Sequence, residues 1–217
     1  MAVELYDDHE QSERVKKWIK EYGFSIVLGL VLAFGGIFGF RQWQDHQVQQ
    51  RFLASEYFDV IQRELDAGEI DIAAEQFGNL REAVPRSSYV VLSGILLAGA
   101  YVDDGQLEPA ARLYREVLDH RGLDSLGPVV TLRLARVLEA QGELDEAMAL
   151  VSGDAPAGFK SAWAELRGDL LMARGDYEQA RLAFQEAIDN ISGQGGNRRL
   201  LQLKIDATGP GLAENAS

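Results

Sequence analysis

A short motif recurs four times along the chain and constrains its fold more than any other feature. Each copy has a glycine, a polar residue, an aliphatic or aromatic residue and, three positions further on, an alanine. The copies are GEIDIA at Gly68–Ala73, GQLEPA at Gly105–Ala110, GELDEA at Gly142–Ala147 and GDYEQA at Gly175–Ala180. Successive glycines are 37, 37 and 33 residues apart. A period of this length is typical of repeat architectures, in which each unit packs on its neighbours.

The intervals bracket the tetratricopeptide period of about 34 residues, and the motifs resemble the turn and second-helix start of that repeat. Each glycine can adopt the left-handed conformation that ends a helix, and each alanine lets the second helix lie close to the first. The packing positions of the repeat also fit, with Tyr101, Tyr114, Leu171 and Phe184 as large residues and Ala98, Ala135, Gly168 and Ala187 as small ones. No stretch shows sustained strand-like alternation. The sequence therefore predicts an all-α chain built mainly as a helical repeat solenoid.

Two of the four units depart from the pattern. The second helix of the third unit meets Ser152, Gly153 and Pro156 early, so it is predicted to be truncated or bent. The first unit has Ile61 at the usual small position and Glu64 at the usual aromatic one. At the other end, residues 197–206 read as a helix that caps the last repeat, and residues 207–217 read as a tail that frays.

A second constraint is an uncharged run of 17 residues, Phe24–Phe40, which Gly23 extends to 18. At about 1.5 Å per helical residue the run of 17 spans roughly 26 Å, close to the hydrocarbon thickness of about 30 Å. Trp18, Tyr22 and Trp43 flank the run, where aromatic rings favour the membrane interface. The alternatives are a buried core helix and a cleaved signal peptide, but the leader carries six acids and no cleavage site precedes Arg41. The run is therefore predicted to be a retained transmembrane helix.

The basic residues near this run predict its orientation. Arg14, Lys16, Lys17 and Lys20 precede it, and only two arginines follow it within a comparable distance. The positive-inside rule places the N-terminus in the cytoplasm and residues 41–217 on the other side, which in a bacterium is the periplasm. The predicted organisation is a cytoplasmic leader (1–22), a transmembrane helix (23–40), a helical extension (41–52), the repeat domain (53–206) and a flexible tail (207–217).

Small residues gather on one side of the predicted transmembrane helix. At about 100° per residue they fall within a sector of roughly 160°, and they are Ser25, Gly29, Ala33, Gly35, Gly36 and Gly39. Small side chains let a second helix approach closely in lipid, where packing replaces the hydrophobic effect. The plainer interpretation is that glycine is frequent in membrane helices. The one-sided arrangement favours a face that packs against another membrane protein.

Composition and residue types argue against catalysis and against nucleic-acid binding. The chain has 34 acidic and 21 basic residues, a net charge of −13, no cysteine and three histidines. Phosphate binding depends on Lys and Arg, thiolate sites need cysteine, and His9, His46 and His120 have no nucleophile or metal-ligand spacing around them. We therefore predict no catalytic residue, no cofactor and no metal site, and a protein that is not an enzyme.

What remains is a surface for protein contacts. In tetratricopeptide proteins the first helix of each pair lines a concave groove. Carried onto this sequence, that geometry gives Leu92, Ile95, Val129, Leu132, Arg136, Glu139, Glu165, Asp169 and Met172 as candidate groove residues. The plainer interpretation is that the charged members only solvate helix faces, with Arg136 and Glu139 as a local pair. A groove that mixes methionine, aliphatic and acidic side chains suits weak binding to varied chains.

Several segments resemble the YfgM family of ancillary SecYEG translocon subunits. They are the acidic leader with its lysine pair, GFRQWQDHQ at Gly39–Gln47, TLRLARV at Thr131–Val137, AELRGDLLMARGD at Ala164–Asp176 and LKID at Leu203–Asp206. The resemblance implies a bacterial inner-membrane protein beside the SecYEG translocon. It also implies a PpiD-type periplasmic chaperone and newly exported polypeptides as partners. The tail after Asp206 adds nothing to the resemblance.

Three functional hypotheses follow. The first is a translocon-associated, chaperone-like adaptor whose glycine face packs against membrane helices and whose groove contacts emerging chains. The second is a periplasmic scaffold for envelope complex assembly that binds one folded partner tightly. The third is a regulator whose leader, residues 1–22, tethers a cytoplasmic response regulator.

Overall fold

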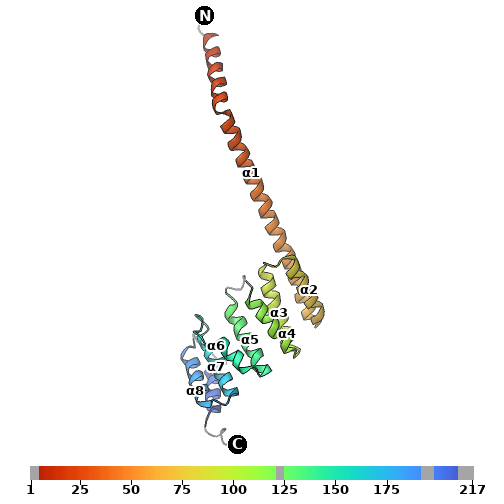
Figure 1. Ribbon diagram of the computed structural model, residues 1–217, viewed down its shortest axis with the longest axis vertical. Helices are drawn as coiled ribbons and strands as arrows, with labels where there is room; N and C mark the ends of the chain where they lie inside the picture. The colour runs from red at the N-terminus through yellow and green to blue at the C-terminus, as the bar shows by residue number, and fades with distance from the viewer. Residues whose placement is uncertain (1–4, 121–124, 192–197, 210–217) are drawn as a thin grey trace. The chain divides into compact units, whose positions relative to one another are not determined.

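The computed structural model describes residues 5–120, 125–191 and 198–209. Within these ranges the chain is helical and contains no strand, which confirms the predicted all-α class (Figure 1). The helices are α1 (Leu5–Asp66), α2 (Ile70–Ala83), α3 (Ser88–Asp103), α4 (Leu107–Leu118), α5 (Gly127–Gln141), α6 (Leu144–Val151), α7 (Lys160–Ala173), α8 (Tyr177–Asp189) and α9 (Arg198–Ala207).

The chain divides into two compact units, Met1–Phe52 and Leu53–Ser217. The first unit contains most of α1, including the apolar run. Among the described residues, the helical segment Lys16–Asp66 is the one that is long and apolar enough to cross a membrane. Its most apolar 18-residue window has a mean hydropathy of 2.2, and none of that window is buried.

The four repeat glycines end helices in the predicted way. Gly68, Gly105, Gly142 and Gly175 have φ angles of 78°, 76°, 80° and 81°. At each one the glycine amide and the next amide donate to carbonyls three and five residues earlier, as in Gly142 to Glu139 and Glu143 to Leu138, both at 2.9 Å. This Schellman arrangement needs a left-handed residue, which glycine supplies without steric cost.

Helices that are consecutive in the chain pack side by side in the second unit, as expected for a solenoid (Figure 1). The motif alanines Ala73, Ala110, Ala147 and Ala180 are fully buried, so each second helix approaches its neighbours closely. Gly168 of α7 lies against Phe184 of α8: a methyl group there would be 2.6 Å from Cδ1 of the ring. A methyl group on Gly94 of α3 would likewise be 2.6 Å from Cγ2 of Val117.

The third repeat has the short second helix that its sequence predicts. The helix α6 ends at Val151, directly before Ser152, and helix resumes only at Lys160. Arg174 tethers this short helix by donating to the Leu144 carbonyl at 3.0 Å and by pairing with Asp145. Exposed ion pairs also join second helices of neighbouring repeats, with Arg81 of α2 paired to Glu116 of α4. Such exposed pairs contribute about 0–1 kcal/mol each.

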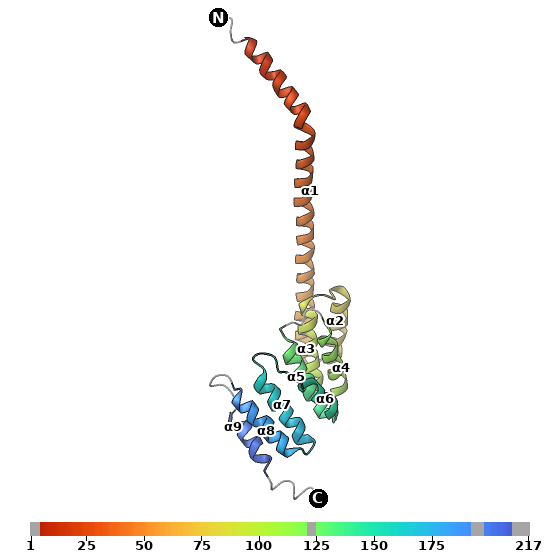
Figure 2. The ribbon, with the colours of Figure 1, turned by 60° about the vertical axis from the view of Figure 1, so that its left-hand side comes forward.

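The predicted capping helix is α9, which lies beside α8 (Figure 2). Its buried Leu201 joins a small cluster with Ala180, Phe184, Ala187 and Ile188, apart from the main core that extends from α1 to α7. Residues 192–197, which precede α9, and the tail from residue 210 lie outside the described residues.

Candidate functional site

Among the described residues, nothing covers the glycines of the apolar run. A methyl group built on Gly29, Gly35, Gly36 or Gly39 would meet nothing within 4 Å. Ala33 is exposed, and the side chain of Ser25 lies outside the described residues. Since no described side chain lies against these glycines, another helix could approach the backbone of α1 closely.

Aromatic pairs lie at the two ends of the apolar run. The rings of Trp18 and Tyr22 are 6.0 Å apart before the run, and those of Phe40 and Trp43 are 6.0 Å apart after it. All four side chains are exposed. Amphipathic rings favour the boundary between lipid and water. One pair at each end of the apolar run is therefore the arrangement expected of a helix that crosses a bilayer.

The candidate groove residues lie on α3, α5 and α7, the first helices of their pairs. On α3, Leu92 is exposed and Ile95 is half-buried; on α5, Val129 is half-buried and Arg136 is exposed. Leu132 is 8% exposed and belongs to the core, so it offers little surface to a partner. Met172 of α7 is half-buried and packs at the edge of the smaller cluster.

The charged candidates form one electrostatic group that includes a residue of α9. Lys204 donates to Glu165 Oε1 at 2.8 Å and to both carboxylate oxygens of Asp169 at 2.7 Å. Arg136 and Glu139 of α5 act electrostatically on the same group. The Lys204, Glu165 and Asp169 side chains are each only about a quarter exposed. The structure therefore brings Arg136, Glu139, Glu165 and Asp169 together, but Lys204 already occupies the last two.

Burial and charge pairing shift the pKa values in this group. Burial raises the pKa of Asp169 and of Glu139, an effect that Lys204 and Arg136 offset only in part. The pKa of Lys204 is also raised, because hydrogen bonds and charge attraction from Asp169 and Glu165 outweigh its own burial. The ammonium group is therefore held firmly in its charged form between two carboxylates.

A hollow of about 390 Å³ adjoins this group at Arg136. It is lined by the end of α3, by α4 and by α5, and it includes Arg133, whose charge acts on the Tyr114 phenol. Burial raises the pKa of that phenol. The hollow offers apolar walls beside the guanidinium groups of Arg133 and Arg136.

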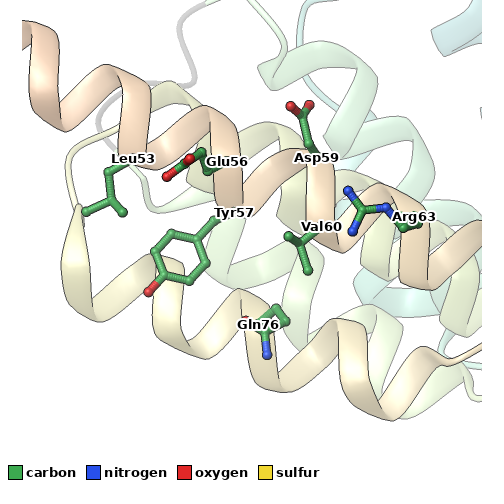
Figure 3. Close-up of a pocket in the computed structure, with 7 residues that line it drawn as sticks. All are labelled: Leu53, Glu56, Tyr57, Asp59, Val60, Arg63 and Gln76. Atoms are coloured by element: carbon green, nitrogen blue, oxygen red, sulfur yellow. The ribbon is translucent and has the colours of Figure 1, made fainter.

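A second hollow, of about 480 Å³, lies between the end of α1 and α2 (Figure 3). Tyr57 and Val60 lie on the side of α1 that faces α2, where Gln76 stands, and Asp59 also lines the hollow. Leu53, Glu56 and Arg63 complete the lining. Apolar and charged side chains alternate here, as on many surfaces that contact proteins.

Both histidines whose side chains the structure describes have hydrogen-bond partners. His120 donates to the Pro85 carbonyl at 2.8 Å, and His46 hydrogen-bonds Gln50 at 3.0 Å; the side chain of His9 is not described. Within the described residues, no group of three or more His, Cys, Asp or Glu side chains is placed to hold a metal ion.

Sequence reasoning missed Lys204 and Arg133. Lys204 is 35 residues from Asp169 in the chain, so no local pattern pairs them. The sequence does contain one signal for this pairing, namely the helical spacing of the residues on α7 and α9. Glu165 and Asp169 are four residues apart on one helix face, and Lys204 follows Leu201 by three residues on the capping helix.

Comparison with known proteins places the chain among relatives of the same architecture. Residues 16–210 match the family model described as a tetratricopeptide repeat-like domain. The ancillary SecYEG translocon subunit of Escherichia coli (strain K12) is 31% identical over 189 residues, covering 86% of this chain and 90% of the relative. The protein of the same name from Aggregatibacter actinomycetemcomitans is 30% identical, covering 95% of this chain and 99% of the relative.

A solved structure supports the fold alone. The crystal structure of BtubC (BKLC) from P. vanneervenii superposes with a TM-score of 0.60, covering 77% of this chain and 76% of that one. Sequence identity is 14%. The helical repeat fold thus occurs in proteins whose sequences differ widely.

Proposed function

The chain belongs to the family of ancillary SecYEG translocon subunits with a tetratricopeptide repeat-like domain, and on this premise we propose that it is a non-enzymatic, membrane-anchored adaptor of the SecYEG translocon. In this role it aids the export and periplasmic handling of newly translocated proteins, beside a PpiD-type periplasmic chaperone. One observation carries the proposal: the family match runs from residue 16 to residue 210, so it includes both the apolar run and the repeats.

The proposal gives each unit a task. The helix at 23–40 crosses the inner membrane once, with the leader in the cytoplasm and the repeat domain in the periplasm. The exposed apolar run, its terminal aromatic pairs and the basic residues before it support this placement. The uncovered face of Gly29, Ala33, Gly35, Gly36 and Gly39, with Ser25 in line, is the proposed contact with other membrane helices.

The topology is tested by a reporter fused to the C-terminus. An enzyme that is active only in the periplasm, such as alkaline phosphatase, should be active in this fusion. A reporter that is active only in the cytoplasm should be silent at the same position. The reverse pair of results would overturn the placement of the repeat domain.

The repeat domain is proposed to hold emerging chains weakly. The candidate residues Leu92, Ile95, Val129 and Met172 offer apolar surface, whereas Arg136 and Glu139 offer charge. Residues 41–217 carry 28 acidic and 17 basic side chains, a net charge of −11. This excess keeps a partly apolar surface soluble and repels anionic lipid.

Photo-cross-linking in native membranes tests the proposed groove. A probe at Arg136 should capture newly exported polypeptides during a short pulse of synthesis. A matched probe at Glu178, an exposed residue of α8, should capture few. Equal capture at both positions would contradict the proposal that the groove binds newly exported polypeptides. Capture of one stoichiometric partner without nascent chains would instead favour a scaffold.

A further inference from the structure

The surface on which α9 packs already binds the ammonium group of Lys204, a residue of α9 itself. Lys204 lies 2.8 Å from Glu165 Oε1 and 2.7 Å from each carboxylate oxygen of Asp169. Its Nζ also lies 5.5 Å from the centre of the Phe184 ring, in cation–π geometry. Three residues earlier in the chain, Leu201 enters the cluster of Ala180, Phe184, Ala187 and Ile188. The surface thus recognises one leucine and one ammonium group on the same face of a short helix.

Without α9 this surface would carry an excess of negative charge. Glu165 and Asp169 are four residues apart on α7, and Glu139 of α5 lies near enough to act on Asp169. Arg136 is the nearby cation that would remain on α5 and α7. The half-buried carboxylates are costly to leave without a partner. A second ammonium or guanidinium group would be drawn to the place that Lys204 now fills.

The helix α9 is short, and it is held by Leu201 and Ile205 in the smaller cluster and by the ion pairs of Lys204. It has ten residues, and an isolated helix shorter than about 12–15 residues is marginal in water. Leu201 is its one buried residue, whereas Leu200 and Leu203 are 39% and 58% exposed. It packs on the smaller of the two clusters rather than on the main core. Elements held in this way open at a free energy well below that of the whole fold.

We propose that α9 is a built-in, displaceable ligand, and that the surface beneath it binds a basic amphipathic helix of a partner protein. The partner helix has a leucine three residues before a lysine or arginine, as Leu201 precedes Lys204. Binding requires α9 to leave, so the contact is autoinhibitory. This inference deepens the proposed function by naming the class of partner segment, but the binding step needs no translocon.

A peptide that copies α9 tests the inference directly. The probe is a labelled synthetic peptide of residues 198–209, RRLLQLKIDATG, titrated into the full-length protein in detergent. The Lys204→Gln chain should bind it about ten-fold more tightly than the wild type, because apparent affinity rises with the fraction of open surface. A peptide with glutamine in place of its lysine should lose binding.

Arg199→Gln is the matched control, because Arg199 is an exposed residue of the same helix and its replacement removes the same charge. This variant should bind the peptide as the wild type does. Equal affinities for the Lys204→Gln and Arg199→Gln chains, or no saturable binding to either, would overturn the proposal.

Hydrogen exchange on the wild type gives a test that needs no variant. The amides of α9 should exchange faster than those of α8, and added peptide should speed the exchange of α9 further by keeping it displaced. Exchange of α9 as slow as that of α8 would make it a fixed cap and refute the inference. Neither result depends on cross-linking to SecYEG, so this proposal and the proposed function fail separately.

Discussion

Replacing Lys204 should lower the stability of the fold more than replacing its ion-pair partner Asp169. The pKa of Lys204 is raised by two carboxylates, so its charged form is favoured, whereas burial raises the pKa of Asp169 and disfavours its charge. Lys204→Gln leaves two half-buried carboxylates without their cation and should lower the free energy of unfolding by about 1–2 kcal/mol. Asp169→Asn removes a costly charge and should lower it by less. Urea unfolding of both variants measures the difference, and a larger loss for Asp169→Asn would contradict this explanation.

The raised pKa values of Asp169 and Glu139 predict that stability depends on pH. Because burial raises the pKa of Asp169 above 3.8 and of Glu139 above 4.5, the folded chain takes up these protons at higher pH than the unfolded chain. Their contribution to stability therefore increases as pH falls through the raised values. The stability of the wild type relative to the Glu139→Gln/Asp169→Asn chain should rise between neutral pH and mildly acidic pH. Urea unfolding at the two pH values tests the sign, and a fall would contradict it.

Gly168 is predicted to tolerate no side chain. A methyl group there would lie 2.6 Å from Cδ1 of the Phe184 ring, which is itself buried. Overpacking of this kind costs about 1–3 kcal/mol, part of which the helix propensity of alanine offsets. Gly168→Ala should therefore lower the thermal midpoint. The control Gly78→Ala, also inside a helix but with nothing within 4 Å, should raise it or leave it unchanged.

At the scale of the element, the turn between α5 and α6 depends on the left-handed Gly142. Its φ of 80° is a conformation that costs an L-residue about 1–2 kcal/mol. Gly142→Ala should lower the free energy of unfolding by that amount in urea titrations. Gly153→Ala, at an open position without positive φ, should change it by no more than about 0.5 kcal/mol. Equal effects would mean that the backbone of Gly142 is not what ends α5.

The repeats were predictable from sequence because their signals are local. Glycine spacing gave the turns, Ala73 and its equivalents gave the close approaches, and the residues after Val151 gave the short α6. The candidate groove was only partly predictable, since helical periodicity places Leu132 and Arg136 on α5 without telling which of them the core covers. The pairing of Lys204 with Asp169 depends on how α9 lies against α7, and no local pattern contains that packing.

At the scale of the whole molecule, the two units need different surroundings. The apolar window of α1 is entirely unburied, which in water would expose a large apolar surface. The second unit buries its own core and carries its charges outside. A bilayer around the apolar run would resolve this contrast, as the proposed membrane anchor requires.

The proposed role in the membrane depends most on what the glycine face of the anchor contacts. A photo-cross-linker at Gly36, with Ala33 as a second probe on the same face, tests this in native membranes. A matched probe at Phe34 lies on the bulky, exposed face. We expect adducts with SecYEG or its associated membrane proteins from probes at Gly36 and Ala33, and mainly lipid adducts from the probe at Phe34. Lipid adducts alone from all three positions would contradict the proposed role.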